Sequence, residues 1–182
     1  MDVSSLLFYE DLSDVVLVGH SYAGMVITGV AAKSPERMKA LVYLDAYVPA
    51  DGQTESDLLP AEMRATIQTD EAAGRGLRQP PPLDFLGITD PEMAVWVKAR
   101  MTPHPMARYI EPVTVGSAQS AALPRAFIHC TGGPTAPVFA PFAAKARAGA
   151  WEVHKLATGH CALLTKPHEV ADLLLKLAAV RK

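Results

Sequence analysis

Ser21 is the first residue whose type and setting suggest chemistry. An apolar, β-branched run over residues 15–18 predicts a strand buried on both faces, and residues 24–32 predict a helix. Ser21 lies on the turn between them, in the segment Gly19-His20-Ser21-Tyr22-Ala23. This is the G-x-S-x-G pattern of a nucleophile elbow, whose small residues avoid clashes around the serine, although Ala23 replaces the second glycine. We therefore predict that Ser21 is a nucleophile.

A serine hydroxyl reacts readily only when a base accepts its proton, so one of the six histidines should lie close to Ser21. His160 follows the last predicted strand, residues 151–157, and this position places it at the same carboxyl edge of the sheet as Ser21. His20 adjoins Ser21, and we expect its ring to point away from the serine. The other histidines lie in the middle region, in strands or at the start of the last helix: His104, His129, His154 and His168. His160 is the predicted general base.

The acid that orients the histidine should also lie at a strand end, between the serine and the histidine in the chain. Residues 131–137, after the predicted strand 125–130, contain no carboxylate. Glu152 is the one acidic residue between Glu111 and His160, and it lies at the wrong end of its strand. By elimination we predict Asp45, which ends the strand over residues 40–44. The alternative is that Asp45 caps the turn over residues 46–51.

The elements that position these residues form an α/β pattern. Strand, helix and strand over residues 15–44 make a β-α-β unit, and the pattern resumes with helices over residues 138–148 and 167–180. Residues 50–122 are rich in proline, glycine and methionine, with helical stretches near 58–69 and 91–100 and no apparent strand. We predict a core of residues 1–49 and 123–182 with a helical cap of residues 50–122. The cap residues that either line a pocket or pack against the core are Met93, Trp96, Met101, Met106 and Tyr109.

Charge and composition narrow the classes of partner. The 182 residues carry 17 basic and 19 acidic side chains, so nothing favours nucleic acid or an anionic membrane surface. No apolar run reaches the roughly 18 residues of a spanning helix, and residues 1–14 lack the features of a signal peptide, so we expect a cytoplasmic location. Cys130 and Cys161 are too few for a disulfide framework and lack metal-ligand spacing.

Four stretches resemble one branch of the α/β-hydrolases, which contains plant methyl esterases, salicylate-binding esterases, hydroxynitrile lyases and related bacterial esterases. They are residues 11–32, 41–52 (LVYLDAYVPADG), 101–112 (MTPHPMARYIEP) and 156–165 (LATGHCALLT). The resemblance implies a parallel, doubly wound α/β-hydrolase sheet with a lid over a pocket. It also implies small carboxylic esters as substrates, an acyl-enzyme on Ser21, and no cofactor or metal. The backbone N–H of Tyr22 would be one oxyanion donor.

Two departures from that family qualify the expectation. The family begins with a strand and an HG-type loop that supplies the second oxyanion donor, and this sequence starts after that region. We therefore expect an N-terminally truncated sheet, weakened activity, and an open strand edge that allows homo-oligomers. Cys161 also stands where bacterial relatives usually carry aspartate beside the histidine.

Other functions remain open beside ester hydrolysis. Hydroxynitrile lyases use the same triad with a lysine next to the histidine, but a neutral Cys161 thiol supplies no such charge, which favours hydrolysis. Dehalogenases and epoxide hydrolases need an aspartate at the elbow, so Ser21 excludes them. A truncated, weakly active hydrolase that binds a small ligand is the remaining alternative.

Overall fold

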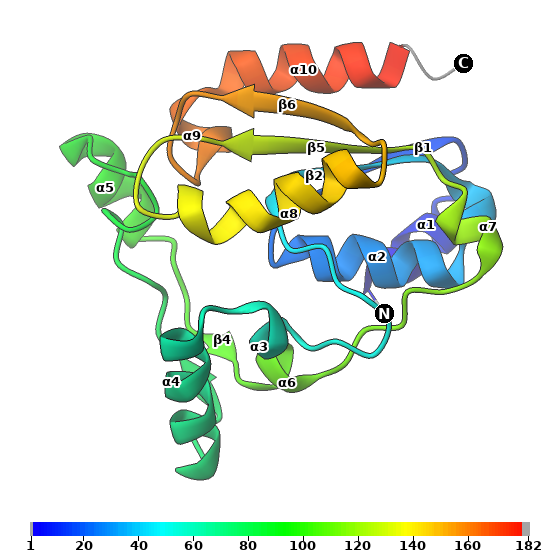
Figure 1. Ribbon diagram of the computed structural model, residues 1–182. Coiled ribbons are helices and arrows are strands. Elements are labelled where there is room, and N and C mark those ends of the chain that lie inside the picture. Colours follow the sequence, from blue (N-terminus) through cyan, green and yellow to red (C-terminus); the bar gives the residue numbers. More distant parts are fainter. Residues whose placement is uncertain (1, 180–182) are drawn as a thin grey trace.

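A parallel four-stranded sheet organises the computed structural model, which describes residues 2–179. In spatial order its strands are β1 (Val15–Ser21), β2 (Met38–Ala46), β5 (Arg125–Cys130) and β6 (Glu152–Leu156). Every neighbouring pair is parallel, so all four strands end at one side, which we call the carboxyl edge (Figure 1).

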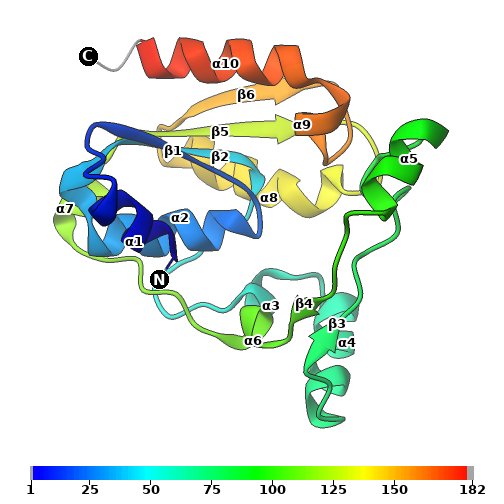
Figure 2. The same cartoon turned by 180° about the vertical axis from the view of Figure 1, so that it is seen from behind.

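Helices cover both faces of this sheet. Helices α2 (Ala23–Lys33) and α8 (Ala136–Ala148) lie on one face, and α10 (Pro167–Ala179) lies on the other (Figures 1 and 2). This is the α/β architecture that the sequence predicts. The predicted last helix agrees through residue 179, and its final residue, Val180, lies outside the described residues.

The apolar run of β2 is explained by two hydrophobic cores. Leu41 and Tyr43 pack into the core shared with α2 and α8, whereas Val42 and Leu44 pack into the core shared with α10. Alternate residues of a strand point to opposite faces, so a strand covered on both sides must be apolar throughout. This pattern allowed the central strands to be predicted from sequence.

The smaller core elements flank this sheet. They are α1 (Asp2–Tyr9), a 3₁₀ helix, η1 (Pro35–Arg37), and α9 (Ala162–Thr165). Residues 50–122, which we call the cap segment, contain five helices and two strands among the described residues: α3 (Glu55–Leu58), α4 (Ala61–Ala72), β3 (Leu77–Arg78), α5 (Pro91–Lys98), β4 (His104–Pro105), α6 (Ala107–Ile110) and α7 (Ala118–Ala121). Helix α5 lies beyond the carboxyl edge, beside α9, in both views (Figures 1 and 2).

The expectation of a cap segment without strands is wrong. Strands β3 and β4 pair antiparallel, with Leu77 opposite Pro105 and Arg78 opposite His104. Two residues are too few to show the alternation of apolar and polar side chains from which a strand is predicted, and proline usually argues against one. The division into core and cap at residues 50 and 122 stays a prediction.

Candidate active site

Ser21 lies at the turn from β1 into α2. Its φ is 56°, in the left-handed region that costs a residue with a side chain roughly 1–2 kcal/mol. Tyr22, with φ −53° and ψ −32°, already has helical angles. The N–H of Tyr47 donates to the carbonyl of Ser21 at 3.2 Å and ties this turn to the chain after β2. The turn therefore has the geometry of a nucleophile elbow.

Two glycines make this sharp turn possible. A Cβ at Gly19 would lie 2.6 Å from the carbonyl oxygen of Ala23, and a Cβ at Gly24 would lie 2.1 Å from that of Tyr47. Backbone atoms cannot move aside to relieve such close contacts, whereas the end of a flexible side chain can. Gly24 is therefore the glycine that lets the elbow helix approach the end of β2, one position later than in the usual pattern.

Asp45 occupies a bulge at the end of β2. His20 pairs with Leu44 and Ser21 pairs with Ala46, so Asp45 is the extra residue in the ladder and has a φ of 42°. A bulge redirects the side chain of the extra residue. The Asp45 side chain is completely buried, and its two carboxylate oxygens bond to Cys130 and His160 instead of capping the turn over residues 46–51.

Asp45 and His160 form a hydrogen bond. Nδ1 of His160 lies 2.8 Å from Oδ2 of Asp45, and the backbone N–H of Cys130 donates to Oδ1 at 3.0 Å. A carboxylate only accepts hydrogen bonds, so Nδ1 carries the proton and Nε2 of His160 is left with its lone pair. The imidazole is thereby set up to accept a proton at Nε2.

Two aromatic rings enclose the imidazole of His160, which is 4 % exposed in the loop between β6 and α9. The ring of Phe139 stacks on it at 4.7 Å between centroids and 9° between planes. The ring of His20 lies 4.5 Å away at 38°. Neither ring contact was predicted: the His20 ring was expected only to point away from Ser21, and no sequence pattern links α8 to this loop.

The cap segment touches the loop of His160 directly. A Cβ at Gly159 would lie 2.7 Å from Cα of Gly87, and the N–H of Cys161 donates to the carbonyl of Leu86 at 3.3 Å. Gly87 has a φ of 77°, which favours glycine. The two backbones therefore pack without intervening side chains, and this contact fixes where the His160 loop can lie.

Burial sets the protonation of the groups around His160. Desolvation, assisted by the neighbouring His160, lowers the pKa of His20 from 6.5 to about 4. Desolvation also raises the pKa of Cys130 to about 12, with a smaller contribution from the charge of Asp45. The pKa of the Cys161 thiol is raised by the same two causes, burial first. His20 and both thiols are therefore neutral at neutral pH.

A buried ion pair lies beside Tyr22. Arg108 of α6 donates to both carboxylate oxygens of Glu55 in α3, at 2.6 and 3.0 Å. The guanidinium also lies 4.3 Å above the rings of both Tyr22 and Tyr109. Burial raises the pKa of Glu55, and the hydrogen bonds and charge of Arg108 oppose that rise. The pair connects the cap segment to the residue that follows Ser21.

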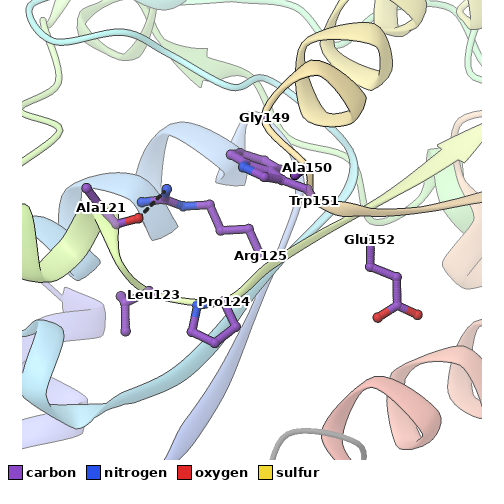
Figure 3. A pocket seen from close by; sticks show the side chains of 8 residues that line it. All are labelled: Ala121, Leu123, Pro124, Arg125, Gly149, Ala150, Trp151 and Glu152. Carbon is purple, nitrogen blue, oxygen red and sulfur yellow. Dashed lines mark hydrogen bonds between the residues drawn. The ribbon is translucent and has the colours of Figure 1, made fainter.

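Two surface hollows are present, and neither is lined by Ser21, Asp45 or His160. One, of about 370 Å³, is at the amino ends of β5 and β6, where Figure 3 shows Arg125 and Trp151 in its wall. The other, of about 390 Å³, lies between α1, α2 and residues 108–114, and includes Tyr22. Neither hollow is lined by any of the five cap residues considered above as possible pocket lining: Met93, Trp96, Met101, Met106 and Tyr109.

The structure thus brings the predicted residues to one edge of the sheet. Asp45 is bonded to His160, and Ser21 pairs in the ladder with Ala46, the residue after Asp45. Among residues 2–179, no group of three or more His, Cys, Asp or Glu side chains is arranged to hold a metal ion. Within the same range, no helix is long and apolar enough to cross a membrane. A carboxylate, an imidazole and a serine hydroxyl are the groups that acyl transfer by a catalytic triad requires.

The chain belongs to the alpha/beta hydrolase family, whose sequence profile matches residues 2–173. Among curated proteins it is similar to the carbendazim hydrolyzing esterase of Nocardioides sp. (strain SG-4G). The two are 35 % identical over 190 residues, which cover 98 % of this chain and 76 % of that protein. The predicted family and fold are confirmed.

Solved structures agree with this assignment. An extracellular α/β-hydrolase from a Paenibacillus species, described as sharing structural and functional homology with tobacco salicylic acid binding protein 2, superposes with a TM-score of 0.81 at 26 % identity, covering 96 % of this chain and 76 % of that one. Polyneuridine aldehyde esterase superposes with a TM-score of 0.63 at 16 % identity, covering 91 % and 72 %, and supports the fold alone.

Proposed function

We propose that this protein is a serine hydrolase that cleaves small carboxylic esters through an acyl-enzyme formed on Ser21. The observation that carries the proposal is the buried hydrogen bond of 2.8 Å between Asp45 and His160, at the sheet edge where the elbow presents Ser21. The esterase name of the Nocardioides relative supports the choice of esters.

The reaction follows from the protonation that Asp45 imposes. Nε2 of His160 accepts the hydroxyl proton as Oγ of Ser21 bonds to the ester carbonyl carbon. The Asp45 carboxylate stabilises the imidazolium that forms, and the backbone N–H of Tyr22 stabilises the oxyanion. The imidazolium then returns the proton to the leaving alcohol as the carbon–oxygen bond breaks. Water, deprotonated by the same His160, releases the acid and restores Ser21.

A lyase reaction on the same residues is less well supported. Such a reaction would need a positive charge beside His160 to hold cyanide, and the neighbouring residue is Cys161. Burial raises the pKa of this thiol, so it is neutral. We therefore retain hydrolysis as the proposal. A small neutral ester is its proposed partner, without nucleic acid or membrane.

Labelling with a fluorophosphonate tests the proposal most directly, because the reagent forms a stable adduct only with an activated serine. We expect a single adduct, located at Ser21 by mass spectrometry, and none in Ser21→Ala. Hydrolysis of p-nitrophenyl acetate and butyrate should also disappear in Ser21→Ala. Retention of more than about a tenth of the turnover would refute a nucleophilic Ser21, since removing the nucleophile costs far more.

Binding without labelling would favour the alternative of a small-ligand binder. Equilibrium dialysis against the same esters, with no adduct and no product formed, would give that result. Cytoplasmic location and homo-oligomer formation stay predictions; the Paenibacillus relative is described as extracellular.

A further inference from the structure

His20 forms a hydrogen bond that the proposed chemistry has not yet used. Its Nε2 lies 2.8 Å from the backbone carbonyl oxygen of His160. A carbonyl only accepts, so Nε2 of His20 carries the proton and donates it. His20 immediately precedes Ser21 in β1, and its ring lies 4.5 Å from that of His160. The bond therefore joins the main chain of His160 to the neighbour of Ser21.

This bond holds the backbone of the His160 loop to β1, which the contacts of His160 with Asp45 and Phe139 do not do. Asp45 fixes the imidazole of His160 at Nδ1, and Phe139 fixes the plane of the ring. Neither contact fixes the loop backbone relative to β1. The His20 bond does so at partly buried atoms, where an unmade hydrogen bond is costly.

The protonation state of His20 stays the same across the pH range in which His160 would act as a base. Burial, with a smaller contribution from the neighbouring His160, holds the pKa of His20 at about 4. His20 is therefore neutral through the pH range in which His160 would act as a base. A neutral ring adds no positive charge that would oppose protonation of His160 during attack.

We propose that His20 is a positioning residue which, by donating from Nε2 to the His160 carbonyl, sets the separation between the His160 imidazole and the Ser21 hydroxyl. The inference rests on the proposed function, because it assigns His20 a part in proton transfer between these two groups. An error of about 1 Å in such a geometry can cost on the order of 10²-fold in rate. Loss of the donor should lower kcat while KM changes little.

Three replacements of His20 separate the hydrogen bond from the bulk of the ring. His20→Phe keeps an aromatic ring but removes the donor, and we expect kcat to fall about 10- to 100-fold. His20→Gln places an amide N–H near the position of Nε2 and should restore kcat to within about threefold of the unaltered chain. His20→Asn carries the same amide on a shorter side chain and should not. Equal losses in all three variants, or none in His20→Phe, would overturn the proposal.

A readout without substrate distinguishes this inference from the proposed function. The Nδ1 proton of His160, bonded to Asp45, should give a downfield proton NMR signal that Asp45→Asn removes. We expect His20→Phe to broaden this signal through faster exchange with water, and His20→Gln to keep it. If the signal responds in this way but Ser21→Ala keeps full turnover, the proposed ester chemistry on Ser21 is wrong, while the positioning of the His160 loop by His20 remains supported. An unchanged signal in His20→Phe would overturn the positioning role.

Discussion

Replacing Asp45 by asparagine keeps the shape of the side chain but changes which of its atoms can accept a hydrogen bond. The backbone N–H of Cys130 donates to Oδ1 of Asp45 at 3.0 Å, and it still requires an acceptor at that position after the replacement. The amide oxygen of the asparagine must therefore face Cys130. Its NH₂ group then faces Nδ1 of His160, across the present distance of 2.8 Å.

This orientation reverses the tautomer of His160. Nδ1 has to accept from the NH₂ group, so the proton moves to Nε2, and Nε2 can no longer take the proton of Ser21. A replacement of this kind in a serine protease lowers kcat about 10⁴-fold, equivalent to about 5.5 kcal/mol in the activation barrier. We expect a loss of that order here. The fold should survive, because asparagine tolerates the φ of 42° at this bulge.

The assay is hydrolysis of p-nitrophenyl butyrate, with thermal unfolding followed by circular dichroism. Glu152→Gln is the matched control, because it also removes one charge but lies at the start of β6, paired with His154 at 2.8 Å. It should leave kcat nearly unchanged. If Asp45→Asn retained more than about a tenth of the turnover, the tautomer argument would be wrong and the orienting acid would have to be another residue.

Two further predictions concern the surroundings of His160. Acidification should destabilise the fold between about pH 6.5 and 4, because the pKa of His20 is 6.5 when exposed and about 4 when folded, so the unfolded chain binds the extra proton. The loss in the free energy of unfolding should reach about 3 kcal/mol at pH 4. Urea unfolding at several pH values should show that the free energy of unfolding depends less on pH in His20→Gln than in the unaltered chain. Gly159→Ala should reduce stability by about 1–3 kcal/mol, since the new Cβ would lie 2.7 Å from Cα of Gly87, and should also lower kcat. Gly76→Ala, whose Cβ would meet nothing within 4 Å, is the control, and equal melting temperatures for the two variants would contradict the packing argument.

The positions of Ser21, Asp45 and His160 could be predicted because each lies at or shortly after the end of a recognisable strand. Parallel strands bring their carboxyl ends together, so the order of elements is enough to gather these residues at one edge. The catalytic roles assigned to them rest on that reasoning and on the tests proposed above.

The finer geometry could not be predicted in the same way. The expectation that His20 points away from Ser21 took no account of the His160 loop, which comes into reach only once β6 and α9 are packed. The stack of Phe139 on His160 and the contact of Gly87 with Gly159 likewise join segments far apart in the chain. These contacts depend on tertiary packing, and no local periodicity encodes them.

The backbone angle of Ser21 has a consequence for the engineering of this protein. Glycine adopts a φ of 56° without the penalty that a Cβ incurs, so Ser21→Gly relieves local strain as it deletes the hydroxyl that we propose as the nucleophile. Asp45 differs, because its carboxylate holds both Cys130 and His160, and glycine there would forfeit two buried hydrogen bonds. A laboratory selection that rewards only heat resistance would therefore favour replacement of Ser21, which the proposed function makes inactivating, and would leave Asp45 unchanged. Libraries screened for thermal tolerance must be sorted by turnover as well.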